Sequence, residues 1–166
     1  MRKSIIFGSS GFIGKHLKQF INGSVLCDIK KEELTTLCDV RNPIGIECGN
    51  ISVIYNLAAI HTTPGHQYHE YFETNIKGAE NICNFAREKN IKTILFTSSI
   101  SPYGTWEDEK TEVSLPLPNS AYGISKLIAE EIHKRWQAEQ PNERKLIIVR
   151  PGVVFGENEG GNFSRL

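Results

Sequence analysis

Gly8-Ser9-Ser10-Gly11-Phe12-Ile13-Gly14 spaces three glycines as GxxGxxG, directly after an apolar run at residues 4–7. Apolar residues with helical spacing follow over residues 12–21, so the stretch predicts a strand, a tight turn and a helix. In such a turn the first glycine permits an unusual φ, the second lets the backbone approach a pyrophosphate, and the third lets helix and strand pack closely. The N–H groups at the helix start then face the phosphates. An ordinary tight turn is the alternative interpretation of these glycines.

An acidic residue at the end of the next expected strand favours the dinucleotide interpretation. Asp28 lies twenty residues after Gly8, at the end of an apolar run over residues 24–28. A carboxylate there can accept hydrogen bonds from the adenosine ribose hydroxyls and would repel a 2′-phosphate. We therefore expect NAD as the cofactor, with NADP less favoured but retained as an alternative because Lys30 and Lys31 lie close by.

The rest of the chain alternates short apolar runs with helical patterns. Strands are expected at residues 4–7, 24–28, 37–40, 52–57, 92–97 and 145–149, and helices at 12–21, 66–89 and 120–138. Three prolines and a run of charges mark residues 101–119 as a loop. Short, continuously apolar strands that alternate with helices indicate an α/β fold of the Rossmann type, a doubly wound parallel sheet with helices on both faces.

Composition narrows the classes of function. The chain has 166 residues, enough for one α/β domain, and its 19 basic residues balance 19 acidic ones. Nothing in this balance suggests a surface for nucleic acid or an anionic membrane. The N-terminal apolar run is too short for a signal peptide or a membrane span, so we expect a cytoplasmic protein. The four cysteines lack zinc-site spacing and are expected to be reduced and mostly buried, and no metal site is expected near His61, His66 and His69.

Two further groups carry candidate chemistry. Tyr122 and Lys126 form a YxxxK motif at the start of an expected helix, where residues four apart share a face. An ammonium near a phenol stabilises the phenolate, so we expect the pKa of Tyr122 to lie below its usual value and the residue to act as an acid/base. Ser99 follows an expected central strand, and ligands bind outside the carboxyl ends of parallel strands. A surface Tyr–Lys pair and a turn serine are the plainer alternatives.

Taken in order, these motifs resemble the NAD-dependent epimerase/dehydratase family of extended short-chain dehydrogenases. Other stretches resemble further elements of that family: Asp39-Val40-Arg41, Asn56-Leu57-Ala58-Ala59, Asn75-Ile76-Lys77-Gly78-Ala79-Glu80-Asn81, Ser98-Ser99-Ile100-Ser101-Pro102-Tyr103-Gly104 and Arg150-Pro151-Gly152-Val153-Val154-Phe155-Gly156.

The resemblance implies a role for each matched position. Tyr122 would exchange a proton with the substrate oxygen, Ser99 would polarise the same oxygen, and Lys126 would hold the nicotinamide ribose and lower the tyrosine pKa. The implied cofactor-binding residues are Gly8, Ser10, Gly11, Phe12, Ile13, Gly14, Asp28, Asp39, Val40, Leu57, Ala58, Ala59, His61, Asn75, Thr97, Tyr122, Lys126 and Pro151. The resemblance also implies a homodimer through the helices around 66–89 and 120–138.

The sequence departs from the family pattern at places that bear on the reaction. Ile100 and Ser101 stand where 4,6-dehydratases place an Asp-Glu pair, which argues against that branch. Val153 stands where many 4-epimerases have an asparagine, which weakens the specific 4-epimerase interpretation. The family implies a longer chain, so we expect residues 1–155 to form the NAD-binding domain with the catalytic residues and residues 156–166 to begin a substrate-binding region.

The expected activity is an NAD(P)-dependent oxidoreductase or epimerase that acts on a nucleotide-activated sugar by hydride transfer at a sugar carbon. Two alternatives stay open. The first is a reductase or dehydrogenase of a non-nucleotide alcohol or ketone. The second is a non-catalytic NAD-binding sensor on the same fold, because a fold alone does not fix a function.

Overall fold

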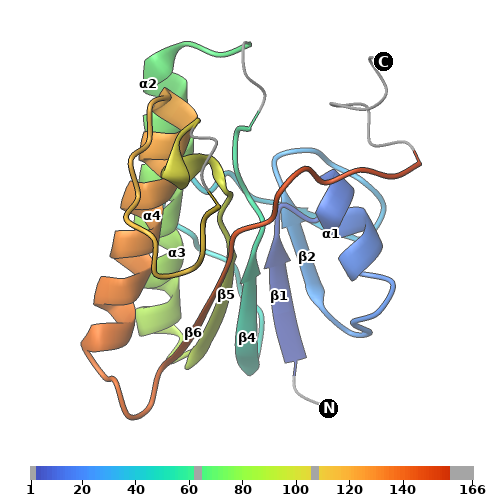
Figure 1. The fold of residues 1–166 in the computed structure, drawn as a ribbon. Coiled ribbons are helices and arrows are strands. Elements are labelled where there is room, and N and C mark those ends of the chain that lie inside the picture. The colour runs from blue at the N-terminus through green and yellow to red at the C-terminus, as the bar shows by residue number, and fades with distance from the viewer. Residues whose placement is uncertain (1–2, 62–64, 106–108, 158–166) are drawn as a thin grey trace.

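A computed structural model describes residues 3–61, 65–105 and 109–157 and shows one six-stranded parallel sheet in the order β3-β2-β1-β4-β5-β6 (Figure 1). The strands are β1 (Lys3–Phe7), β2 (Val25–Asp28), β3 (Thr35–Leu37), β4 (Ile51–Asn56), β5 (Thr93–Thr97) and β6 (Lys145–Val149). From β1 the chain adds β2 and then β3 on one side of the sheet. It then returns to place β4 on the other side of β1 and adds β5 and β6 beyond β4. The reversal places a switch point at the carboxyl ends of β1 and β4, where ligands bind in such sheets.

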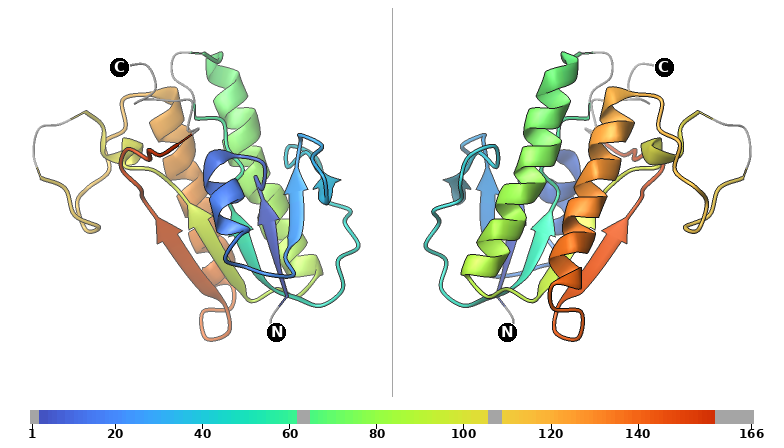
Figure 2. Two further views of the ribbon diagram at one scale, coloured as in Figure 1. Left: turned by 90° about the vertical axis from the view of Figure 1, so that its right-hand side faces the viewer. Right: turned by 90° about the vertical axis from the view of Figure 1, so that its left-hand side faces the viewer.

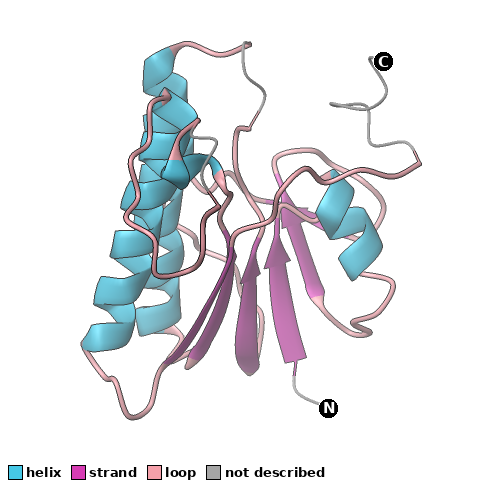
Figure 3. Cartoon of the chain, in the orientation of Figure 1, coloured by secondary structure: helices cyan, strands magenta, loops and turns pink. Residues whose placement is uncertain are grey.

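Helices cover both faces of this sheet, as the sequence predicts. The short helix α1 (Phe12–Leu17) lies on one face, and α3 (Lys77–Glu88) and α4 (Ala121–Ala138) lie side by side on the other (Figure 2). The helix α2 (Tyr68–Tyr71) and a π-helical turn, η1 (Phe72–Ile76), lead directly into α3. Figure 3 shows that the long connection between β3 and β4 holds no helix.

The core lies between the sheet and the α3–α4 layer. Phe7, Ile54 and Phe96 point from three neighbouring strands into it, and all three are buried. The ring of Phe85 from α3 meets Phe7 edge to face, with centroids 5.9 Å apart. Burial of each such side chain contributes about 1.5–3 kcal/mol, so these contacts fix the two helices on the sheet and thereby fix the residues that α4 presents at its edge.

Three elements differ in extent from the prediction. The third strand covers Thr35–Leu37 rather than 37–40, because the backbone leaves the ladder after the N–H of Cys38 bonds to the Asp28 carbonyl. The helix expected over 66–89 is interrupted by the π-helical turn, and α1 ends at Leu17 rather than at 21. Within the proline-containing loop, Ser101–Tyr103 form one turn of 3-10 helix, while residues 106–108 lie outside the described part.

All four cysteines are free thiols. Cys27 and Cys83 are buried, whereas Cys38 and Cys48 are half-buried. Burial raises the pKa of Cys27 and of Cys83 to about 12, and it also raises the pKa of Cys38 and of Cys48. The expected reduced state agrees with this arrangement, and burial is complete for two of the four.

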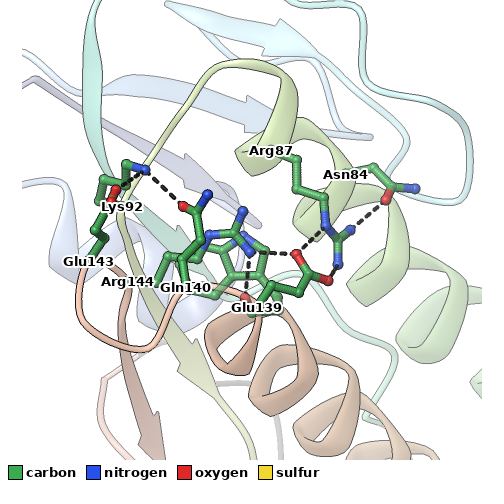
Figure 4. Close-up of polar contacts among 8 residues, drawn as sticks. Asn84, Arg87, Lys92, Glu139, Gln140, Glu143 and Arg144 are labelled. Carbon is green, nitrogen blue, oxygen red and sulfur yellow. Dashed lines mark hydrogen bonds and ion pairs between the residues drawn. The ribbon is translucent and has the colours of Figure 1, made fainter.

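The end of α4 that lies away from the carboxyl edge is fastened by an ion-pair cluster (Figure 4). Glu139 accepts hydrogen bonds from Arg87 of α3 at 2.7 and 2.9 Å and from Arg144 at 2.6 Å. Arg144 also lies over the ring of Trp136, 4.9 Å from its centroid. Lys92, just before β5, pairs with Glu143 at 2.7 Å. The cluster ties α3, α4 and the turn into β6 together.

Candidate functional site

The glycine-rich turn between β1 and α1 has the geometry that its sequence predicts. Gly8 has φ +83°, and a Cβ there would lie 2.7 Å from the Ala58 backbone nitrogen. A Cβ on Gly14 would lie 2.3 Å from the Gly8 carbonyl oxygen, so only glycine lets the helix approach the strand this closely. A Cβ on Gly11 would meet only the Gly8 oxygen, at 3.4 Å. The two outer glycines therefore serve packing, and the middle one leaves open space in front of the turn.

The turn also presents polar groups that suit a diphosphate and a ribose. The hydroxyls of Ser9 and Ser10 are buried and have no hydrogen-bond partner among the described residues. Asp28 lies beside them, and its carboxylate accepts the N–H of Ser10 at 2.9 Å and the N–H of Lys30 at 3.0 Å. Because buried hydroxyls are normally bonded, these two indicate a polar ligand at the turn. The residues present thus fit a dinucleotide.

The segment directly after β4, residues 57–60, lies beside this turn. The Leu57 N–H bonds to the Phe7 carbonyl at 2.9 Å, which keeps Leu57, Ala58 and Ala59 against the end of β1. Asn75, in the π-helical turn, holds the next residue by accepting the Ile60 N–H at 3.0 Å and donating to the Ile60 carbonyl at 3.1 Å. Asn75 also donates to Ser125 of α4 at 2.9 Å. Asn75 therefore connects the segment at residues 57–60 to α4.

The expected adenine end lies after β3. Asp39 accepts a two-pronged hydrogen bond from Arg41, with distances of 2.7–3.0 Å, and its pKa is lowered mainly by that bond. Val40 is buried and packs on α3, where a Cβ on Gly78 would lie 2.9 Å from the valine side chain. His61, which directly follows the segment at residues 57–60, is exposed. An adenine contact for Asp39 and Val40 stays a prediction.

Tyr122, Ser99 and Lys126 are brought together at the carboxyl ends of β5 and β6. Ser120 caps α4 by accepting the Gly123 N–H at 3.0 Å, which starts the helix so that Tyr122 and Lys126 lie on its inner face. The Ser99 side chain lies close enough to Tyr122 to lower the pKa of the phenol, and its hydroxyl donates to the Ser101 hydroxyl at 3.0 Å. The Lys126 ammonium donates to the Thr97 carbonyl at 2.7 Å and lies 4.3 Å from the centre of the Phe96 ring.

Electrostatics at this cluster differ from one expectation. Burial raises the pKa of Tyr122, and the nearby Ser99 side chain only partly offsets that rise. The expected lowering by Lys126 is not seen, because the ammonium is directed to the Thr97 carbonyl. Burial lowers the pKa of Lys126 itself to about 7. The lysine is thus poised between its charged and neutral forms near neutral pH.

The remaining predicted residues lie around the same edge. Pro151 follows β6, and its carbonyl accepts the Ile100 N–H at 3.1 Å, next to Ser99. Phe12 and Ile13 are half-buried at the start of α1. A Cβ on Gly156 would lie 2.9 Å from the Phe12 ring, so the chain after Pro151 crosses the edge to reach α1.

Sequence reasoning gave no role to a buried polar cluster behind these residues. Glu130 accepts hydrogen bonds from Ser98 and Arg150, and Arg150 also donates to the Tyr103 hydroxyl. On the same helix, His133 stacks on Phe96 and contacts Asn56 at 3.3 Å, and burial lowers the pKa of His133 to about 4. Helical spacing was the available signal, since residues 122, 126, 130 and 133 recur on one face.

Two findings bear on metals and membranes. Within residues 3–61, 65–105 and 109–157, no three His, Cys, Asp or Glu side chains group as metal ligands. The helices of the same ranges include none whose length and apolarity would let it cross a bilayer.

Comparison with known proteins shows which enzyme family this chain matches. Residues 4–165 match the model of the "NAD dependent epimerase/dehydratase family". The N-acetyl-alpha-D-glucosaminyl-diphospho-ditrans,octacis-undecaprenol 4-epimerase of Escherichia coli O157:H7 is 31% identical over 98% of this chain and 52% of its own length. GDP-6-deoxy-D-talose 4-dehydrogenase of Aggregatibacter actinomycetemcomitans is 27% identical over 97% and 56%. The chain therefore spans about half the length of these relatives.

Solved structures agree on the fold. The UDP-N-acetylglucosamine 4-epimerase from Bacillus cereus superposes with a TM-score of 0.81 at 23% identity, covering 99% of this chain and 66% of that one. MoeE5 in complex with UDP-glucose and NAD superposes with a TM-score of 0.78 at 25% identity, covering 89% and 53%. The predicted Rossmann-type fold is confirmed.

Proposed function

Because the chain belongs to the NAD dependent epimerase/dehydratase family, we propose that it binds NAD and performs oxidation and reduction at a carbon of a nucleotide-activated sugar. The observation that carries the proposal is the meeting of Ser99, Tyr122 and Lys126 at the same sheet edge as the glycine-rich turn. The family match confirms the predicted family and its dependence on NAD.

The cofactor-binding part of the proposal follows the edge of the sheet. The turn at Gly8–Gly14 would receive the diphosphate, and Asp28 would accept hydrogen bonds from the adenosine ribose and disfavour a 2′-phosphate. The cofactor would lie against Leu57, Ala58 and Ala59, and its nicotinamide ribose would be bound by Lys126. When bound, NAD supplies the hydride acceptor and donor for the sugar carbon.

The proton is handled by the chain itself. Tyr122 would take a proton from the sugar hydroxyl as that carbon is oxidised and return it on reduction, while the Ser99 hydroxyl donates a hydrogen bond to the same oxygen. Charged Lys126, once it is turned from the Thr97 carbonyl toward the phenol side, would favour the phenolate. Residues 1–155 would thus hold the cofactor and the reacting groups, and residues 156–166, of which 158–166 lie outside the described residues, would begin the substrate-binding region.

The substrate class rests on the relatives. One relative is named for a GDP-linked sugar, and MoeE5 was solved with UDP-glucose. The Escherichia coli relative is named for a sugar carried through a diphosphate on undecaprenol, which is not a nucleotide. On the relatives with nucleotide sugars, a nucleotide-activated sugar is the proposed substrate. We also place the reaction in the cytoplasm, where free thiols such as the four found here stay reduced.

Replacement of the phenol tests the proposed chemistry. We expect Tyr122→Phe in the complete enzyme to reduce turnover at least about a hundredfold, because general acid–base catalysis contributes on that scale, and to leave NAD binding nearly unchanged. Tyr55→Phe, on β4, is the matched control. Turnover is followed by nicotinamide absorbance and product analysis with nucleotide sugars. Unchanged turnover in Tyr122→Phe would rule out the proton role.

We further propose a homodimer through the helices around 66–89 and 120–138. Ile124 and Ile128 lie one turn apart on α4, and they are 37% and 39% exposed. Tyr68 and Phe72 add exposed aromatic surface at the other helix. Sedimentation of the chain should give a dimer mass that Ile128→Lys lowers to the monomer. A monomeric wild type would contradict the assembly and leave the chemistry untouched.

A further inference from the structure

The buried carboxylate of Glu130 is placed to control the geometry of the reacting groups. It lies two helical turns beyond Tyr122 and one turn beyond Lys126 on the same face of α4, and its side chain is fully buried. Its oxygens accept the Ser98 hydroxyl at 2.5 Å and two Arg150 N–H groups at 2.5 and 2.8 Å. One side chain of α4 is therefore bonded to the ends of both β5 and β6.

The partners of Glu130 adjoin the proposed site directly. Ser98 immediately precedes Ser99, and Arg150 immediately precedes Pro151. Arg150 also donates to the Tyr103 hydroxyl and lies over that ring, 4.7 Å from its centroid. The network thus holds Ser98 and Tyr103, the two ends of the short segment that carries Ser99.

Stability alone does not account for this arrangement. Burying a carboxylate and a guanidinium costs several kcal/mol of desolvation per ion, and well-packed apolar side chains of similar volume are often as stabilising. What an ion pair adds is direction, because three hydrogen bonds define where Ser98 and Arg150 lie. A geometric role explains why charged groups stand at this buried position.

We propose that Glu130 is a positioning residue, which holds the Ser99 side chain beside Tyr122 through Ser98 and Arg150. The inference rests on the proposed function, since it assigns Glu130 to the same Tyr122–Ser99 pair. The charged or titratable groups that face Glu130 are Arg150, which directly follows β6, and Lys126, His133 and Lys134 on its own helix. The titratable group near Tyr122 is Tyr71, with ring centroids 6.2 Å apart.

The ionisation of Tyr122 reports on this contact. The nearby Ser99 side chain lowers the pKa of Tyr122, so moving that side chain away should raise the pKa. Removing the negative charge of Glu130 has the opposite effect on any nearby phenol, because a phenolate is more stable when a like charge is taken away. The sign of the change therefore separates positioning from simple charge.

The experiment titrates Tyr122 by fluorine NMR in chains labelled with difluorotyrosine, which ionises at milder pH, with Tyr122→Phe used for assignment. Glu130→Gln should raise the pKa of Tyr122 by about half a unit or more. Glu131→Gln, the same change at the next residue, should leave it unchanged, since Glu131 pairs with Lys134 on the outer surface. Ser98→Ala should give a smaller rise and carries the test if Glu130→Gln does not fold.

A Tyr122 pKa that falls or stays constant in these variants would overturn the positioning role. NAD binding by the wild-type chain, measured by calorimetry, tests the proposed function separately. If the wild type bound no NAD and Glu130→Gln still raised the pKa, the proposed function would fail and the positioning role would stand.

Discussion

At the scale of single residues, the three glycines of the first turn have different tasks although their spacing looks regular. Gly14 is needed because a Cβ would lie within 2.8 Å of the Ser9 backbone and 2.3 Å from the Gly8 oxygen. Gly11 meets nothing closer than 3.4 Å. Gly14 is thus needed for the close packing of helix and strand, whereas Gly11 keeps the space in front of the turn open.

This difference predicts separable effects. Gly14→Ala should lower the free energy of unfolding by about 1–3 kcal/mol, since backbone atoms must move. Gly11→Ala should leave stability unchanged or raise it by up to about 1 kcal/mol through the unfolded state, yet weaken NAD binding about tenfold or more. Urea denaturation and calorimetry measure the two quantities.

Gly45→Ala, with no heavy atom within 4 Å of the added Cβ, is the control for both measurements. Equal losses of stability in Gly11→Ala and Gly14→Ala would show that this division of tasks is wrong.

Residue identities and spacing were enough to find the proposed site, but not its electrostatics. The sequence places Ser99, Tyr122 and Lys126 at element ends, and the structure brings them to one edge. The predicted lowering of the Tyr122 pKa was wrong, because the direction depends on burial and on where the Lys126 ammonium points. Glu130 was missed for a related reason: a carboxylate on a helix is usually exposed, and its partners come from distant strands.

At the scale of elements, hydrophobic periodicity located every strand of the described sheet to within a few residues. It did not reveal the π-helical turn at Phe72–Ile76, since one wider turn barely alters a helical pattern. The brevity of β3 was equally hidden, because tertiary hydrogen bonds to β2 decide where an edge strand stops.

The ion pairs at the end of α4 predict a pH-dependent contribution to stability. Hydrogen bonds from Arg87 and then Arg144 lower the pKa of Glu139 from 4.5 to about 2. A lowered carboxylate pKa stabilises the folded state above the unfolded value, so the contribution is complete above pH 4.5 and is lost as the pH falls toward 2. Glu139→Gln should cost about 1 kcal/mol or less near neutral pH, because the pair is partly exposed and screened by water.

Urea denaturation at several pH values measures this effect, and the gap between wild type and Glu139→Gln should close on acidification. Glu131→Gln, whose ion pair with Lys134 is more exposed, should change stability little at any of these pH values. A gap that widens toward low pH would contradict the assignment.

At the scale of the whole molecule, the two faces of the sheet are covered unequally. Neighbouring residues of a strand point to opposite faces. Leu146 and Ile148 of β6 pack against the core beneath the helices, whereas Ile147 and Val149 are 38% and 41% exposed on the other face. α1 lies over the β1 side of that other face (Figure 2).

The unequal covering predicts opposite responses at adjacent positions. Ile148→Ala should lower the free energy of unfolding by about 2 kcal/mol or more, since it opens the packed layer. Ile147→Ala should cost less than about 1 kcal/mol, mostly through strand propensity. Urea denaturation of the two variants measures the contrast, and an Ile147→Ala loss as large as that of Ile148→Ala would mean that the outer face is packed as tightly as the inner one.

The four unpaired thiols have a practical consequence for studying this molecule. A thiol reacts as its thiolate, and all four native thiols hold their protons more firmly than a cysteine in water. A new cysteine on an exposed loop would therefore be alkylated first, with the natural ones left in place. Fluorescent or spin labels could in this way be attached at one chosen point without first redesigning the interior.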